Sequence, residues 1–196
     1  MTNFRSPYCS RNPQEFWRRW HISLSTWFQD YLYIPLGGSR VKVPRYVLNL
    51  LITFTVSGLW HGASWTFVVW GAYHGILVSS YVLVRKFRER HAGVEKKESS
   101  RFVSGARTLL SVVATFVLVD IGWIFFRADS FSDAWFVVSH LFADFSLDPA
   151  YIVSQLSLMG FDKESLILVV VLLVFLVAVD TVNYRRESQH RNEVPQ

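Results

Sequence analysis

The sequence predicts an all-α, polytopic helical membrane protein with about four transmembrane helices plus amphipathic or re-entrant helices, arranged as a single membrane domain over residues 1–196. Three observations support this fold class. Apolar residues make up 51% of the chain and charged residues only 18%, below the roughly 25% of soluble domains. Long apolar runs alternate with basic or acidic segments. The single cysteine, Cys9, excludes a disulfide framework.

Residues 12–40 are expected to form an amphipathic helix and a turn. The helix begins with an Asn-Pro-Gln-Glu sequence, which combines a capping asparagine, a proline in the first turn and a glutamate three residues after the cap. A Pro-Leu-Gly-Gly-Ser turn ends it. Such a helix suits the membrane interface or the side of a helix bundle. Its apolar face comprises Phe16, Trp20, Leu24, Trp27, Phe28 and Tyr31.

Four apolar runs follow this segment. The first two, 47–60 and 64–84, are expected to form a helical hairpin over 47–84 with His61 at the break. The others, 108–126 and 165–183, are expected to be transmembrane helices. A span needs about twenty mainly apolar residues, so the last three runs qualify by themselves. The first qualifies only if it is tilted, shielded by protein or extended through the turn.

The charge distribution predicts the topology. Residues 1–46 contain seven Lys and Arg, and residues 85–107 contain eight, whereas residues 127–164 contain two against six acidic residues. Basic loops that flank membrane helices stay cytoplasmic. We therefore expect 85–107 to be a cytoplasmic loop and 127–164 to be periplasmic or interfacial, with a short interfacial helix within Phe131–Phe145.

A few polar side chains lie within apolar surroundings. Ionisable groups at membrane depth are energetically unfavourable, which makes them functional candidates. The sequence contains no metal-ligand spacing, no glycine-rich phosphate loop, no Gly-x-Ser-x-Gly elbow and no nucleic-acid-binding module. We therefore expect no metal, no bound cofactor and no nucleic-acid partner. The polar candidates are His21, Asp30, Asn49, Ser57, His61, His74, Asp120 and Asp180.

His61 lies in a Gly-Leu-Trp-His-Gly-Ala-Ser-Trp sequence between two apolar runs. A buried imidazole has a lowered pKa, so it would be neutral and able to act as a general base. An interfacial histidine that caps carbonyl groups at a helix turn explains the same pattern. We expect the flanking Trp60 and Trp65 to contribute to substrate binding by lining the site.

The other two histidines also allow two interpretations. His21 follows two arginines that could meet a phosphate or a lipid headgroup, but the residues alone favour an ordinary basic interface anchor. Arg19 and Asp30 are further candidates for substrate binding. His74 lies within a Gly-x-x-x-Gly pattern that allows close approach of another helix, so a hydrogen bond to that helix is at least as consistent as catalysis.

Three motifs together resemble the membrane-bound O-acyltransferase (MBOAT) family. They are Asn-Pro-Gln-Glu-Phe-Trp-Arg-Arg-Trp-His-Ile-Ser-Leu-Ser from position 12, Asp-Tyr-Leu-Tyr-Ile-Pro-Leu-Gly-Gly-Ser from position 30, and the His61 sequence. Gly-Trp-Ile-Phe-Phe-Arg-Ala-Asp from position 122 is also similar to this family. The resemblance is to the branch that contains the alginate O-acetylation protein AlgI and the D-alanyl transfer protein DltB.

The resemblance implies an acyltransferase of the bacterial inner membrane, with multiple spans. Its essential histidine corresponds to His61 and its supporting histidine to His21. The implied donor is acetyl-CoA or another acyl thioester on the cytoplasmic side. The implied acceptor is an extracellular polysaccharide, reached directly or through a periplasmic acetyltransferase, as in alginate O-acetylation. The lipid bilayer is the implied surrounding.

Two alternatives remain open at this point. One is D-alanyl transfer to teichoic acid, and the other is an inactive, truncated membrane subunit. Members of the family are usually much longer and have further helices before the His21 motif. The chain is therefore expected to correspond to the C-terminal portion of such a protein.

The charge pattern generates the first testable prediction, which concerns topology. Reporter fusions at Glu95 and Asp148 should report opposite sides of the membrane, with Glu95 in the cytoplasm, because basic loops are retained there. Alkaline phosphatase and green fluorescent protein fusions measure the two sides independently. Reports from the same side at both positions would contradict the four-span topology.

Overall fold

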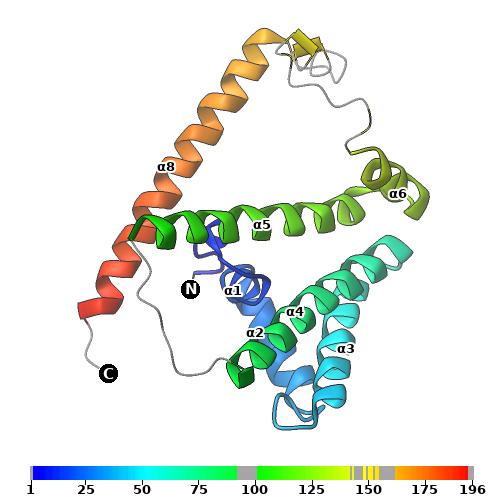
Figure 1. The fold of residues 1–196 in the computed structure, drawn as a ribbon. Coiled ribbons are helices and arrows are strands. Elements are labelled where there is room, and N and C mark those ends of the chain that lie inside the picture. The colour runs from blue at the N-terminus through cyan, green and yellow to red at the C-terminus, as the bar shows by residue number, and fades with distance from the viewer. Residues whose placement is uncertain are drawn as a thin grey trace. The chain divides into compact units, whose positions relative to one another are not determined.

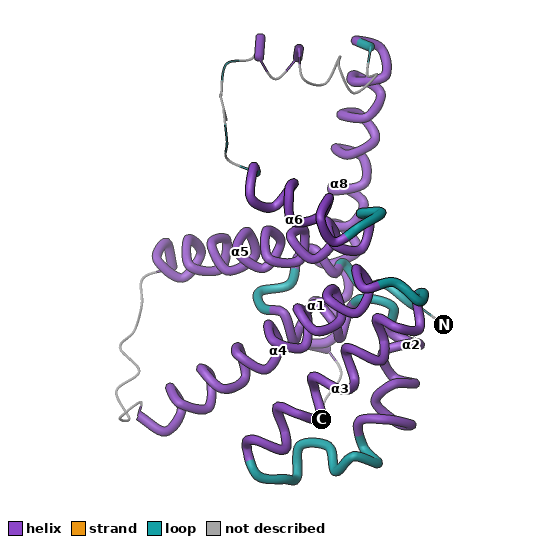
Figure 2. Tube along the Cα trace, turned by 90° about the vertical axis from the view of Figure 1, so that its right-hand side faces the viewer, coloured by secondary structure: helices purple, strands orange, loops and turns teal. Residues whose placement is uncertain are grey.

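The structure is a computed structural model that describes residues 2–91, 101–141, 143, 148, 150–151, 153–154 and 162–193. Within these residues all regular elements are helical (Figure 2), which confirms the predicted all-α class. The chain divides into two compact units, Met1–Val138 and Ser139–Gln196. The two units are described separately below.

The amphipathic segment is not one continuous helix. It consists of η1 (Pro7–Cys9), α1 (Pro13–Arg19), α2 (Ile22–Phe28) and the π-helical turn η2 (Gln29–Tyr33). The predicted helix start is confirmed, because the Asn12 side chain accepts a hydrogen bond from the Glu15 N–H at 2.8 Å. The expected continuity is wrong, since the helix ends at Arg19 and α2 begins only after His21.

The interruption lies at His21, which adopts a left-handed conformation with φ 42° and ψ 56°. This region is unfavourable for a residue other than glycine. The N-terminal segment stabilises the interruption, because Arg5 N–H donates to the Arg19 carbonyl at 3.0 Å and Ile22 N–H donates to the Asn3 carbonyl at 2.9 Å. Backbone groups that a helix end leaves unpaired are thereby satisfied.

The helices α3 (Val43–His61) and α4 (Trp65–His91) pack side by side as a hairpin (Figure 1). His61 is the last residue of α3, so the chain turns where the break is predicted. The backbones approach closely at glycines: a Cβ atom on Gly71 would collide with the Phe54 carbonyl oxygen, and one on Gly58 would collide with that of Phe67. Apolar side chains of both helices fill the remaining interface, including Tyr46, Leu50, Val78 and Val82.

The helix α5 (Arg101–Arg127) packs against α4, and Tyr73 Oη donates to the Leu118 carbonyl at 2.8 Å. The segment 85–107, predicted to be a loop, is helical at both ends, because residues 85–91 belong to α4 and residues 101–107 belong to α5. Residues 92–100 lie outside the described residues. The helix α6 (Phe131–His140) lies within 131–145, where a short interfacial helix is expected. Positions 142, 144 and 145 of that range lie outside the described residues, and the interfacial location stays a prediction.

The second unit contains α8 (Lys163–Glu193). Three helical stretches among the described residues are long and apolar enough to cross a membrane: Trp65–His91, Val103–Arg127 and Glu164–Val182. The chain is thus a membrane protein with several apolar helices. The first expected span, α3, is not among them, and it packs on α4 and η2. The four-span topology stays a prediction.

The contact between α3 and α4 generates a stability prediction. Gly71→Ala should lower the free energy of unfolding by about 1–3 kcal/mol, because the new methyl group meets the backbone of α3. The measurement is the thermal unfolding midpoint in detergent.

Gly105→Ala on α5 is the matched control. A Cβ atom there has no neighbour within 4 Å, so the substitution should be neutral or stabilising by up to roughly 1 kcal/mol through helix propensity. Equal midpoints for the two variants would contradict the importance of the close approach.

Candidate active site

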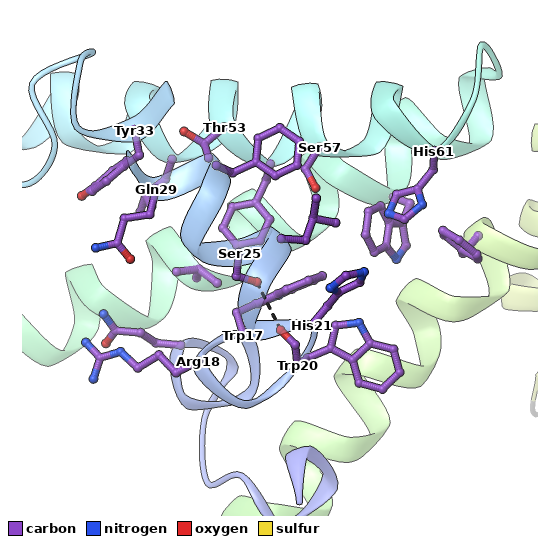
Figure 3. A pocket seen from close by; sticks show the side chains of 18 of the residues that line it. Trp17, Arg18, Trp20, His21, Ser25, Gln29, Tyr33, Thr53, Ser57 and His61 are labelled. Carbon is purple, nitrogen blue, oxygen red and sulfur yellow. Dashed lines mark hydrogen bonds between the residues drawn. The ribbon is translucent and has the colours of Figure 1, made fainter. Parts of the chain in front are cut away.

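A cavity of about 450 Å³ lies within the first unit, between α1, α2, η2, α3, α4 and α5 (Figure 3). One wall is a single face of α3, whose lining residues recur at spacings of three and four. From Tyr46 to His61 this face extends for about 22 Å, at 1.5 Å per residue. The cavity is therefore elongated along the helix. The α3 residues that line it are Tyr46, Leu50, Thr53, Phe54, Ser57 and His61.

The two predicted catalytic histidines line this cavity together. His61 reaches it from the C-terminal end of α3, and His21 reaches it from the interruption between α1 and α2. Figure 3 shows both rings in the same part of the cavity. The Nδ1 atom of His21 is buried and has no hydrogen-bond partner among the described residues. A buried imidazole nitrogen without a partner is available to a bound molecule.

Aromatic rings surround His61 on two sides. The Trp70 ring lies edge-on with its centroid 5.3 Å away, and the Phe126 ring lies edge-on at 5.0 Å. Burial lowers the pKa of His61 below its ordinary value of 6.5, and the charge of His21 lowers it further. A lowered pKa keeps the imidazole neutral near pH 7, which is the form that accepts a proton.

The tryptophans that line the cavity are not those expected from the sequence. Trp60 is 60% exposed and Trp65 is 77% exposed, and neither lines the cavity. Trp60 contacts the His61 ring, with centroids 5.1 Å apart, but consecutive residues of a helix point about 100° apart. The tryptophans that do line the cavity come from other elements: Trp17, Trp20, Trp70 and Trp123.

The other two expected substrate-binding residues also lie outside the cavity. Arg19 forms an ion pair with Glu15 at 2.6 Å, and Asp30 is exposed. Their immediate neighbours Arg18 and Gln29 line the cavity instead. The sequence predicts a continuous helix through this region, but the interruption at His21 changes which side chains face the cavity.

Several residues that line the cavity were not predicted as site residues. Thr53 and Ser57 precede His61 by eight and four residues, so helical spacing places them on its face, and Ser57 alone was among the polar candidates. At the other end of the cavity lie Arg18 and Tyr46, and the Lys86 ammonium group lies 4.7 Å from the Tyr46 ring centroid. The sequence around Arg18, Tyr46 and Lys86 is basic, but residue spacing does not indicate that three helices bring them together.

Comparison with known proteins defines the class. The model of the MBOAT, membrane-bound O-acyltransferase family matches residues 2–100. The chain belongs to this family, which confirms the resemblance found in the sequence.

Three curated relatives are similar to this chain. The chain is 40% identical to the probable alginate O-acetylase AlgI of Pseudomonas aeruginosa, over 89% of this chain and 31% of that protein. It is 42% identical to a peptidoglycan O-acetyltransferase of Helicobacter pylori, over 67% and 23%. It is 30% identical to a teichoic acid D-alanyltransferase of Bacillus subtilis, over 66% and 33%. The chain thus spans about a third or less of the length of these relatives.

Proposed function

We propose that this chain forms the acyl-transfer centre of a membrane-bound O-acetyltransferase. The acetyl group would come from a cytoplasmic thioester donor and pass toward hydroxyl groups of an extracellular polysaccharide. The names of the AlgI relatives, which are probable alginate O-acetylases, support acetylation of a polysaccharide. The single observation that carries the proposal is that His61 and His21 line one aromatic cavity. The proposed location is the bacterial inner membrane.

The chemistry requires a base and a protected thioester. The neutral His61 imidazole takes the proton of the acceptor hydroxyl while the hydroxyl oxygen attacks the thioester carbonyl carbon. The carbon–sulfur bond then breaks, and the departing thiolate takes the proton back from the imidazolium. His21 has a buried free nitrogen and would orient the donor or the acceptor by a hydrogen bond. The aromatic walls exclude water, which would otherwise hydrolyse the thioester.

The shape of the cavity supports a long donor. Acetyl-CoA or another acyl thioester has an extended arm, and the cavity follows α3 for about 22 Å. Arg18 and Lys86 lie near the end opposite His61 and would attract a phosphate-bearing donor. Lys42 and Arg45 precede or begin α3, and basic flanks favour the cytoplasmic side for this end. The lipid bilayer and a periplasmic acetyltransferase or polysaccharide acceptor are the proposed partners.

D-alanyl transfer to teichoic acid is the second candidate, because two relatives with that name are 30% and 31% identical. The AlgI relatives are more similar, at 39–45% identity. A D-alanyl donor carries an ammonium group that a carboxylate would stabilise, yet no Asp or Glu is among the described residues that line the cavity. This lining favours an uncharged acetyl group. An inactive membrane subunit remains the outcome if no transfer is detected.

His61 provides the direct test of the proposed function. His61→Ala and His61→Gln should both lower acetyl transfer by about 10²–10⁴-fold, because glutamine can form hydrogen bonds but cannot accept the proton. The variants are introduced at the native locus, and the acetyl content of the secreted polysaccharide is measured.

The control variant is His91→Gln, since His91 is exposed at the end of α4, away from the cavity. Immunoblots of membranes establish equal protein levels for all variants. Near-normal acetylation by His61→Gln would contradict the general-base assignment and leave His61 as a positioning group.

The lowered pKa of His61 predicts the pH dependence. The reaction requires neutral His61, so kcat/KM should fall as the pH decreases through the pKa, with a midpoint below 6.5. His21→Gln removes the charge that helps to lower this pKa, so the midpoint should move upward toward 6.5. The measurement is kcat/KM in membranes between about pH 5 and about pH 8, the range in which histidine titrates. A midpoint above 6.5 in the unmodified protein would contradict the role of a buried neutral base.

A further inference from the structure

We infer that His74 is a positioning residue for the acyl-transfer centre. It accepts a hydrogen bond from Trp17 and thereby holds α1, which leads into His21, against α4 of the hairpin that carries His61. The inference rests on the proposed function and deepens it, because it assigns a role to a histidine that does not line the cavity.

The position of His74 is unusual for a group without a chemical role. The side chain is 0% exposed and lies in the middle of the apolar helix α4. Burial of a polar ring at this depth is unfavourable unless the ring is hydrogen-bonded. Trp17 Nε1–H donates to His74 Nδ1 at 3.4 Å, whereas Nε2 has no partner among the described residues. The imidazole therefore makes one specific bond, which leads to α1.

The helix α5 leaves room for the His74 imidazole. A Cβ atom on Gly122 of α5 would lie only 2.5 Å from His74 Nε2, so a glycine is needed there to accommodate the ring. The Trp17 and Trp70 rings lie edge-on to His74, with centroids 5.0 Å and 5.2 Å away. Packing alone would be satisfied by an apolar side chain of similar volume in this position.

Trp17 connects α1 to the hairpin. Its ring lines the cavity and contacts Phe54 of α3 at 5.2 Å and Trp70 of α4 at 5.7 Å, between centroids. The helix α1 has only seven residues, which is too short to be stable without tertiary contacts. The other hydrogen bond from α1 to α4 among the described residues, between Gln14 and Arg85, is exposed. The Trp17–His74 bond is the more protected link, because His74 is buried and Trp17 is half-buried.

This bond relates the two histidines of the cavity. His21 lies four residues after Trp17 and two residues beyond the end of α1. Trp70 lies one turn before His74 on α4 and is edge-on to His61. A shift of α1 along α4 would therefore move His21 relative to His61. Misplacement of a reacting group by about 1 Å costs on the order of 10²-fold in rate, so a single hydrogen bond at this place can affect turnover.

A matched pair of variants separates positioning from packing. His74→Gln keeps an oxygen acceptor for Trp17, whereas His74→Leu has a similar volume and no acceptor. If the hydrogen bond matters, His74→Leu should lose about 10- to 100-fold in kcat with KM changed less than about threefold, and His74→Gln should retain most of the activity. If His74 acts only by packing, the apolar leucine should be tolerated at least as well as glutamine, which would overturn the inference.

Trp17 supplies the second arm of the experiment and keeps the inference testable if a His74 variant fails to fold. Trp17→Phe keeps an aromatic ring and removes the donor, so it should lower kcat to a similar extent. In the double variant with His74→Leu the losses should not add, because both substitutions remove the same bond. Additive losses would overturn the inference. His91→Gln is again the control.

A readout that does not depend on activity distinguishes failure of this inference from failure of the proposed function. Modification of histidines by diethylpyrocarbonate is followed by mass spectrometry in native membranes. His74→Leu should increase the modification rate of His21 several-fold and leave that of His91 unchanged. An unchanged rate at His21 would overturn the positioning role. Absent acetyl transfer in the unmodified protein, with the expected change at His21, would overturn only the proposed function.

Discussion

The close approach of α3 and α4 is the constraint on which the candidate site depends. Gly58 and Gly71 allow backbone contact between the two helices, because a Cβ atom at either position would collide with a carbonyl of the other helix. With the helices this close, the turn after α3 is short and His61 is held at its end. The α3 face that begins at Tyr46 then remains free to line the cavity. Small residues thus contribute to the candidate site indirectly, because they fix the position of the helix that carries His61, the proposed base.

The second constraint is the left-handed backbone of His21. A continuous helix from Asn12 would have placed His21 on a regular helical face with no tie to the N-terminal segment. The interruption instead directs the ring into the cavity, and hydrogen bonds from the segment at Asn3 and Arg5 satisfy the exposed backbone groups. An unfavourable backbone conformation at a functional residue is a recurring feature of binding sites. The strained backbone of His21 is compensated by the backbone hydrogen bonds from Arg5 to Arg19 and from Ile22 to Asn3.

The sequence predicted much of this protein because its signals are local. The apolar runs, the helix start at Asn12 and the Gly-x-x-x-Gly pattern depend on nearby residues. Among the described residues, three of the four runs form helices apolar enough to span a membrane, the helix begins as expected, and Gly71 and Gly75 lie against α3. The family motifs indicated His61 and His21, which share the cavity. Residues next to His61 in the sequence did not predict which side chains line the cavity. Trp60 is exposed and does not line it, whereas Trp123 lines it from the distant helix α5. The interruption at His21 depends on tertiary hydrogen bonds, which periodicity does not encode.

The arrangement of charges along the cavity gives the proposed reaction a direction. Cationic groups, Arg18 and Lys86, lie near one end, whereas the other end contains two imidazoles among aromatic rings. In the proposed reaction, a phosphate-bearing donor would be attracted to the cationic end, and its uncharged acyl terminus would fit the aromatic end. At that end a charge on His21 disfavours protonation of His61, so the pair favours one neutral imidazole as the proton acceptor. Recognition of the donor and activation of the acceptor can therefore occupy opposite ends of one cavity without competing for the same side chains.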